Sequence, residues 1–428
     1  MRCSVLLAGL PLAFATSSVL AQVQVDLVAL VGAPLTGWDG GVVTSLNTPS
    51  VNQLGQPGFT GAVVNGAGTT NFVYTRDKIV HVNANVVSPV LTGAESQVGI
   101  SNTGGFNFSP SADGGDSVYT QNGLLLRAGD LAPGLPGQNS VFNSRPLMAA
   151  DGSPFWIGGV GPAASTTTRV LYSATPAGVI TPRLVGGAAV GGTNITATGL
   201  DFGYNVSTDG NHFINRVIFT GPTATDQGVV VDGTTIVARE GSIPGGGSAA
   251  WQAFRSVDIN NAGNHIVYGD DAGPTATDDI LVYNGNVIVR QGDTLAGLTL
   301  GTTIDAAAIN NLNQIVQLWD LPGTSQEGLF FGHADSIGDS ILLGRTGDLL
   351  DVNGDTVADY TLTDFNGSST ISNPIDLGDG PKIYVDVDLI PIGGTAAVEA
   401  IIAFTVPEPG SVALAGIAAL QLLRRRRA

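Results

Sequence analysis

One short phrase recurs along this 428-residue chain, and its spacing constrains the fold more than any other feature. Each copy has an apolar residue, then Asn or Asp, then a small or polar stretch containing Gly, then alternating aromatic or aliphatic residues. The anchors of the copies are Asn52, Asn102, Asp151, Asp209, Asn261, Asn311 and Asp379. Because successive anchors are separated by about 50 residues, each copy marks one unit of a repeat fold.

A second phrase follows most anchors: a strand, a Gly turn, a second strand ending in Arg, and then Gly-Asp. Copies run from Val118 to Asp130 and from Leu281 to Asp293, with a partial copy from Ile341 to Asp348. The Asn284-Gly285 pair predicts a tight hairpin, because both residues tolerate the positive φ angles of a two-residue turn. We expect the recurring Arg and Gly-Asp to form a turn with an Arg–carboxylate contact between neighbouring blades.

The repeats predict an all-β chain. Each has room for four short strands, and no part of the body keeps a 3.6-residue helical period. The pattern predicts a β-propeller of about seven four-stranded blades. Tandem β-sandwich domains are the alternative, because strand spacing alone fits both. Residues 25–50 resemble the second half of a repeat, which the last repeat (366–405) lacks, so we expect an N-terminal strand to complete the final blade.

The composition of the chain excludes some classes of function. The chain has 17 basic and 35 acidic residues and a net charge of −18, which excludes binding to nucleic acid through its phosphates. The single cysteine, Cys3, lies in the N-terminal segment, so we expect no disulfide and no thiolate site in the body.

The N-terminus is typical of a secretion signal. Residues 1–21 combine the positive Arg2, an apolar run and small residues before a cleavage site between Ala21 and Gln22. The body is therefore expected to comprise residues 22–405 and to be exported through the inner membrane.

The C-terminus (406–428) has three parts in a fixed order: a proline motif, an apolar stretch and a basic cluster. The motif is Val406, Pro407, Glu408 and Pro409, and the cluster is Arg424, Arg425, Arg426 and Arg427. The apolar stretch between them predicts a short helix of roughly 21 Å, shorter than a hydrocarbon core of roughly 30 Å. By the positive-inside rule the arginines stay cytoplasmic.

This order closely resembles the PEP-CTERM sorting signal of bacteria. The resemblance implies recognition by an exosortase-type transpeptidase, transient anchoring in the inner membrane and removal of the tail. Its short apolar stretch suits a processing signal better than a permanent transmembrane helix.

The anchor phrase resembles the tandem-repeat family named for Asn-x-x-Gly-x-x-Ala-Phe, whose members carry various surface anchors. Asn261-Ala262-Gly263 and Asn102-Thr103-Gly104 match it loosely. The resemblance implies a surface location and a repeat architecture, but it does not indicate a particular chemical activity.

One segment follows the spacing of a calcium loop. Asp351, Asn353, Asp355 and Asp359 place oxygen ligands at positions 1, 3, 5 and 9, but position 6 is Thr356 rather than Gly. The alternative is a plain Asp-Asn-Gly turn stabilised by local hydrogen bonds.

The other candidate site residues are expected to have structural roles. The pairs Asp270-Asp271 and Asp278-Asp279 flank Gly273-Pro274, so we expect a solvated loop rather than glycosidase carboxylates. The four histidines lack metal-ligand spacing, and Trp156, Trp251 and Trp319 are expected in the core. The sequence therefore predicts a non-enzymatic surface or extracellular-matrix protein that binds exopolysaccharide or another envelope component; the alternative is an exported polysaccharide hydrolase or lyase.

Overall fold

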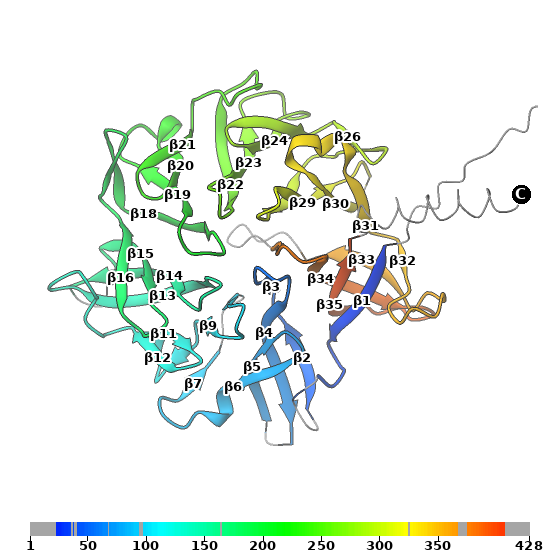
Figure 1. Cartoon of the computed structure of the whole chain (residues 1–428), viewed down its shortest axis with the longest axis horizontal. Helices are drawn as coiled ribbons and strands as arrows, with labels where there is room; N and C mark the ends of the chain where they lie inside the picture. The colour runs from blue at the N-terminus through cyan, green and yellow to red at the C-terminus, as the bar shows by residue number, and fades with distance from the viewer. Residues whose placement is uncertain are drawn as a thin grey trace, which may run out of the picture. The chain divides into compact units, whose positions relative to one another are not determined.

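Seven antiparallel sheets are arranged around a common axis, and together they form a seven-bladed β-propeller (Figure 1). The computed structural model describes residues 23–406 except 36, 38–40, 67, 94–96, 163–164, 324–325 and 367–374. The prediction of seven four-stranded blades is confirmed, and the tandem-sandwich alternative is wrong.

The blades follow one another along the chain. Blade 1 has β2 (Val42–Leu46), β3 (Ser50–Val51), β4 (Pro57–Asn65), β5 (Gly68–Thr75) and β6 (Lys78–Val82). Blade 2 has β7 (Leu91–Thr92), β8 (Val98–Ile100), β9 (Phe106–Phe108), β10 (Ser111–Ala112), β11 (Gly115–Thr120) and β12 (Gly123–Arg127). Blade 3 has β13 (Asn139–Met148), β14 (Pro154–Gly161), β15 (Thr168–Ala174) and β16 (Ile180–Val185). Blade 4 has β17 (Ala189–Val190), β18 (Thr193–Val206), β19 (Phe213–Phe219), β20 (Gln227–Val231) and β21 (Thr235–Arg239).

The second part of the ring repeats the plan. Blade 5 has β22 (Trp251–Ile259), β23 (His265–Asp271), β24 (Asp279–Tyr283) and β25 (Asn286–Arg290). Blade 6 has β28 (Ile304–Ile309), β29 (Gln314–Asp320), β30 (Glu327–His333) and β31 (Ile341–Arg345), preceded by the hairpin of β26 (Thr294–Leu295) and β27 (Leu298–Thr299). Blade 7 has β32 (Leu349–Leu350), β33 (Tyr360–Phe365), β34 (Lys382–Pro391) and β35 (Val398–Thr405). Three short 3₁₀ turns, η1 (Asn83–Asn85), η2 (Thr223–Thr225) and η3 (Ala334–Asp339), lie between strands.

Four strands in each blade, called A to D from the axis outward, run alternately up and down. The A strand of blade 5 is β22, and β23, β24 and β25 are its B, C and D strands. The anchor turns join A to B, so in an antiparallel sheet the turns that join C to D lie on the same face, which we call the anchor face. In the C–D turn of blade 5, Asn284 and Gly285 have φ angles of 46° and 81°, as the Asn-Gly pair predicts.

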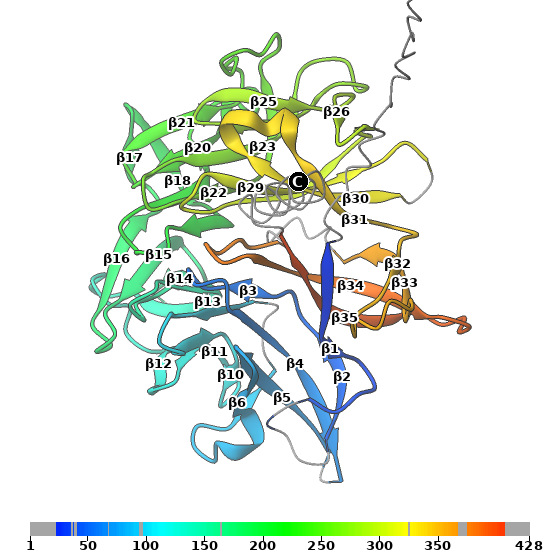
Figure 2. The ribbon, with the colours of Figure 1, turned by 45° about the vertical axis from the view of Figure 1, so that its right-hand side comes forward.

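The first strand closes the ring. β1 (Gln24–Leu30) pairs antiparallel with β35, from Gln24 opposite Thr405 to Leu30 opposite Ala400 (Figure 2). Lys382 Nζ also reaches Asp26 Oδ2 at 2.7 Å. Blade 7 therefore takes its outermost strand from the start of the body, which confirms the predicted closure and covers an edge that would otherwise invite aggregation.

Apolar side chains pack between neighbouring blades. The cluster between blades 5 and 6 includes Tyr268, Trp319 and Phe330, and the cluster between blades 2 and 3 includes Trp156. Trp156 and Trp319 are completely buried and Trp251 nearly so, which confirms that they belong to the core. Burial of large aromatic side chains at each junction holds the blades together.

The recurring Arg and Gly-Asp form a turn as predicted, but the turn lies within one blade and the expected contact between blades is wrong. Asp130, Asp293 and Asp348 each accept a hydrogen bond from the backbone N–H of the Arg three residues earlier, at 2.8–2.9 Å. The short Asp side chain reaches the backbone of its own turn, as Asp side chains commonly do in turns.

The predicted signal (1–21), its cleavage site at Ala21 and Gln22, and the tail from Pro407 onward lie outside the described residues. Across the part of the chain that is described, no helix has the length and apolar character needed to cross a membrane.

Candidate functional site

In five blades an Asn or Ser side chain at the end of the A strand closes the anchor turn, while Ala149 and Gly378 occupy this place in blades 3 and 7. Asn260 Oδ1 accepts from the backbone amides of Ala262 and Asn264 at 3.0 Å, and Asn310 repeats this pattern in blade 6. Asn is suited to this place because its short side chain reproduces a backbone turn. The next residue is then free to reach the neighbouring blade.

These next residues form a hydrogen-bonded belt that links every blade to the following one. Its donors and acceptors are Asn102 Nδ2 to Gln53 Oε1 (3.2 Å), Asn102 N to Ala150 O (3.2 Å), Ala150 N to Thr208 O (2.6 Å), Asp209 N to Asn261 Oδ1 (2.9 Å), Asn261 N to Asn311 Oδ1 (2.8 Å), Asn311 N to Asp379 Oδ1 (2.9 Å) and Asp379 N to Gln53 O (2.8 Å). The belt returns to its starting residue, so it closes the ring a second time near the axis.

The belt corrects the register of two anchors. In blades 1 and 3 the linking residues are Gln53 and Ala150, one residue away from Asn52 and Asp151, whereas in blade 4 both Thr208 and the anchor Asp209 make links. Asn and Asp suit either of the two adjacent turn positions, so the sequence alone could not separate them.

A small cavity of about 50 Å³ lies among the ends of the A strands of all seven blades. Asp258 and Asp376 line it, and each carboxylate binds a backbone amide of the next blade, Ile309 N at 2.7 Å and Val51 N at 2.9 Å. Burial raises the pKa of both carboxyls, and Asp376 adds to the effect on Asp258. This volume is far below the several hundred Å³ of a sugar-sized pocket.

An acidic junction lies between blades 6 and 7, on the face opposite the anchor turns. Carboxylate oxygens of Asp305, Asp320 and Glu327 lie within 4.8 Å of one another. Burial raises the pKa of Asp305 to about 6, and burial together with the neighbouring Asp364 raises that of Glu327. Oxygen-only ligands of this kind suit Ca²⁺ or Mg²⁺.

This junction was not predicted from the sequence. Asp305 lies in a bulge between Ile304 and Ala306, where the register of β28 against β29 shifts. Asp320 and Glu327 are a cross-strand pair. The available signal was a pair of acids on either side of a Pro-Gly turn, at Pro322-Gly323.

The acids beside Gly273-Pro274 are not a solvated loop, contrary to the prediction. Asp271 and Asp279 are buried, because Arg290 and Arg255 neutralise them. Burial raises the pKa of Asp279 to about 7, against the opposing effect of Arg255. A buried carboxylate is stable only with such a partner, so these acids belong to the structure of blade 5.

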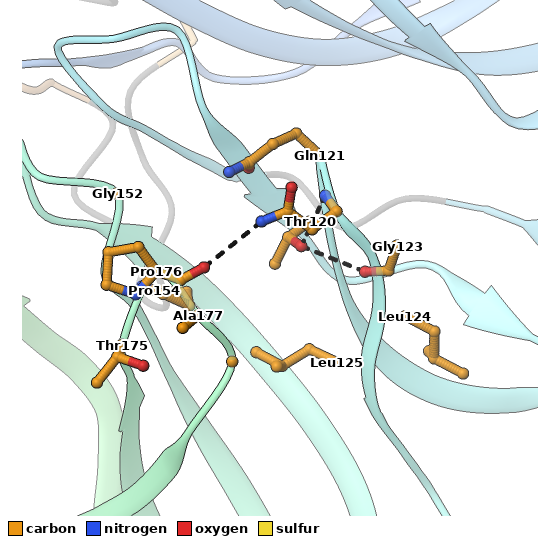
Figure 3. A pocket seen from close by; sticks show the side chains of 12 residues that line it. Thr120, Gln121, Gly123, Leu124, Leu125, Gly152, Pro154, Thr175, Pro176 and Ala177 are labelled. Carbon is orange, nitrogen blue, oxygen red and sulfur yellow. Dashed lines mark hydrogen bonds between the residues drawn. The ribbon is translucent and has the colours of Figure 1, made fainter.

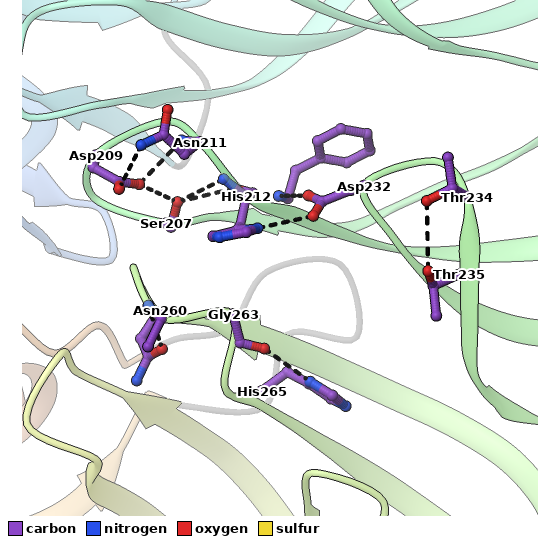
Figure 4. Close-up of polar contacts among 12 residues, drawn as sticks. Ser207, Asp209, Asn211, His212, Asp232, Thr234, Thr235, Asn260, Gly263 and His265 are labelled. Carbon is purple, nitrogen blue, oxygen red and sulfur yellow. Dashed lines mark hydrogen bonds and ion pairs between the residues drawn. The ribbon is translucent and has the colours of Figure 1, made fainter.

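The polar network at the anchor turns of blades 4 and 5 contains a His–Asp pair (Figure 4). His212 Nδ1 lies 2.8 Å from Asp232 Oδ2, while the Ser207 hydroxyl donates to Asp209. Among the described residues, the histidine rings contact Asn83, Asp232, the Gly263 carbonyl and Asp335, and none contacts a Ser or Thr hydroxyl. These contacts do not make a Ser-His-Asp triad.

Open clefts lie between the C–D turns of neighbouring blades on the anchor face. One cleft of about 490 Å³ separates the Gln121-Asn122 turn of blade 2 from the Pro176-Ala177 turn of blade 3 (Figure 3). A second cleft, of about 620 Å³, lies at the C–D turn of blade 1 beside Thr103 of blade 2. Both are in the size range of small-molecule sites.

The predicted calcium loop is an exposed turn between β32 and β33. Asp351 Oδ2 accepts from Thr356 N at 2.7 Å, and Asp359 Oδ1 accepts from Asn353 Nδ2 at 3.0 Å. Thr356 has a φ of 72°, the conformation that Gly adopts at position 6 of calcium loops. Among the described residues, Asp351, Asp355 and Asp359 do not form a group with oxygens within 4.8 Å, so calcium binding stays a prediction.

The PEP-CTERM protein-sorting motif matches residues 405–427, which confirms the resemblance of the tail. No curated protein matches the chain.

Two solved structures are similar to it. One is a protein of unknown function from Dyadobacter fermentans DSM 18053, with 12% identity and a TM-score of 0.37, covering 89% of this chain and 99% of that one. The other is the Dos1 propeller, with 10% identity and a TM-score of 0.37, covering 89% and 95%. The sorting motif indicates export and sorting by an exosortase-type system, so the chain is an exported, exosortase-sorted β-propeller protein.

Proposed function

We propose that this chain is a non-enzymatic cell-surface or extracellular-matrix protein that binds exopolysaccharide or another envelope component. The observation that carries the proposal is the sorting motif at residues 405–427, attached to a propeller with open clefts between its blades. The axial cavity of about 50 Å³ has no room for a sugar. Binding is therefore assigned to the clefts of the anchor face, outside the axis.

The body fits the tandem-repeat family named for Asn-x-x-Gly-x-x-Ala-Phe. The two matching segments, at Asn102 and Asn261, occupy the same belt position in blades 2 and 5. This equivalence supports a common repeat unit.

A glycan array probed with the full-length protein tests the proposal, with a parallel assay for new reducing ends on each bound glycan. We expect binding of at least one polysaccharide class without release of reducing ends. An array without any bound glycan overturns the binding role.

An exported hydrolase or lyase is the second candidate, and the acidic junction favours it. The raised pKa of Glu327 suits a general acid that stays protonated near neutral pH, with Asp320 as the second carboxyl group beside it. New reducing ends that disappear in Glu327→Gln would establish this enzyme in place of the binding protein.

A further inference from the structure

The cleft beside the C–D turn of blade 1, which we call the blade 1–2 cleft, differs from its counterparts by carrying basic side chains. Arg76 and Lys78 line it, together with Asp77 of the same turn, Thr103 of blade 2 and Tyr384 of blade 7. The cleft of about 490 Å³ between blades 2 and 3 is lined by polar and apolar residues, and none of them carries a charge. Two cations in one cleft are conspicuous in a chain with twice as many acidic as basic residues.

Backbone hydrogen bonds identify the positions in other blades that correspond to Arg76. Arg76 N donates to Pro57 O at 2.7 Å, Asp232 N donates to Phe213 O at 2.9 Å, and Asn284 N donates to His265 O at 3.0 Å. Pro57, Phe213 and His265 are the first residues of B strands. Arg76, Asp232 and Asn284 therefore occupy the same place in the C–D turns of blades 1, 4 and 5.

All three residues have positive φ angles, of 64°, 52° and 46°. Asp and Asn tolerate this conformation, while a residue with a long side chain adopts it at some cost. In blades 4 and 5 the side chain also has a structural task, because Asp232 Oδ1 and Asn284 Oδ1 accept the first backbone N–H of their B strands at 2.9 and 3.0 Å. Figure 4 shows Asp232 in this role.

In blade 1 that structural task does not exist. The B strand begins with Pro57, which has no backbone N–H to bind. The corresponding side chain is thereby released, and Arg76 reaches across to blade 2 instead. The turn requires a positive φ at this place but does not require an Arg there, so the long side chain in this conformation indicates a functional constraint.

The Arg76 guanidinium is held in place before any ligand arrives. Nη2 donates to the carbonyl of Asn102, and the guanidinium packs against the backbone at Gly104, where its carbon lies 3.4 Å from the position of an added Cβ. A guanidinium has five N–H donors. Arg76 makes no ion pair with any carboxylate among the described residues.

Lys78 and Tyr384 complete the polar lining. Within the described part of the chain, neither the Lys78 ammonium nor the Tyr384 hydroxyl has a hydrogen-bond or ion-pair partner. Most other basic side chains of the body are already paired; the ion pairs engage Arg127, Arg216, Arg255, Arg290, Arg345 and Lys382. Asp77 offsets part of the positive charge, so a compact anion suits the cleft better than a highly charged one.

We propose that the blade 1–2 cleft binds a carboxylate-bearing sugar of an acidic polysaccharide, with Arg76 and Lys78 as its cationic contacts. A planar guanidinium binds a carboxylate through two parallel hydrogen bonds, and an ammonium adds a point charge beside it. The hydroxyls of Tyr384 and Thr103 offer hydrogen bonds to sugar hydroxyls, and about 620 Å³ accommodates a sugar unit. This inference rests on the proposed binding function and names its ligand class.

Calorimetric titration of the full-length protein with tetragalacturonate tests the proposal at 0.15 M salt, where the overall acidity of the chain is largely screened beyond about 8 Å. The fully methyl-esterified tetrasaccharide is the matched ligand, because it keeps the sugars and removes the charge. We expect the free acid to bind at least about tenfold more tightly than the ester, since hydrogen bonds to charged groups are the stronger ones.

Arg76→Asn is the decisive variant, because it installs the residue type that blade 5 uses at the same place and so keeps the turn. We expect it to weaken binding of tetragalacturonate about tenfold or more without lowering the melting temperature. Lys78→Ala, at an exposed strand end, should weaken binding several-fold. Thr234→Ala is the control, because Thr234 lies in the C–D turn of blade 4 and lines neither cleft.

Equal affinity for the ester, or unchanged affinity in both Arg76→Asn and Lys78→Ala, overturns the proposal. Binding of neutral glycans alone also overturns it, while the proposed binding function survives. The absence of binding to any glycan removes both.

Discussion

Replacing Asn311 by alanine is expected to lower the free energy of unfolding by about 3 kcal/mol, because its side chain connects four blades. Oδ1 accepts from Asn261 N at 2.8 Å, and Nδ2 donates to Asp379 Oδ2 at 2.9 Å and to Thr208 Oγ1 at 3.1 Å. A neutral hydrogen bond contributes about 0.5–1.5 kcal/mol and one to a charged group about 1.5–3 kcal/mol. The sum is about 2.5–6 kcal/mol, and the half-buried site lets water replace part of it.

Urea unfolding followed by tryptophan fluorescence measures this change, since Trp156, Trp251 and Trp319 are buried between blades. For a body of this size, about 3 kcal/mol corresponds to a fall of about 4 °C in melting temperature. Asn122→Ala is the matched control on the same face, because its amide makes one long contact, to Pro176 O at 3.5 Å. That variant should stay within about 0.5 kcal/mol of the wild type.

If Asn311→Ala matches the Asn122→Ala control, the belt does not hold the ring together. The blades would then depend on apolar packing alone.

Three further outcomes are expected. Burial raises the pKa of Asp386 to about 7, so its contribution to stability is complete below about pH 4 and is lost as the pH rises through 7. The loss in the free energy of unfolding reaches about 4 kcal/mol. Asp386→Asn should therefore flatten a plot of melting temperature against pH. Calcium added to the full-length protein should release heat that Asp355→Ala abolishes and Glu327→Gln preserves, if the loop from Asp351 to Asp359 is the site. Deletion of Gln24–Leu30 should leave β35 as an open edge and produce oligomers in size-exclusion chromatography.

Each of these outcomes has a clear contrary result. A pH profile of Asp386→Asn that overlays the wild type would show that this carboxyl is ionised in the folded state. Equal calcium heats for wild type and Asp355→Ala would remove the loop as a site. A monomeric deletion variant with an unchanged urea midpoint would mean that β1 is dispensable for closure.

The propeller could be predicted because its determinants are local. Asn284-Gly285 forms the expected hairpin, the tryptophans occupy the interfaces between blades, and the N-terminal strand completes blade 7. Each of these depends on the order of residue types within one repeat. The two parts of blade 7 could be identified because the last repeat lacks an outer strand and the start of the body has one without a repeat of its own.

The acidic sites could not be predicted, because they depend on distant partners. Asp279 looks like a loop residue until Arg255, 24 positions away, neutralises it. The junction of Asp305, Asp320 and Glu327 requires a bulge at Asp305 that shifts the strand register. The unusual place of Arg76 depends on backbone hydrogen bonds that make its turn equivalent to those of blades 4 and 5, and the sequence does not show these bonds.

The pairing of β1 with β35 links folding to the order of export. β1 leads the body across the membrane, whereas β35 ends at Thr405, where the match to the sorting motif begins. In a chain exported from its N-terminus, blade 7 can therefore be completed only after the residues up to Thr405 have crossed, and the sorting segment follows directly behind them.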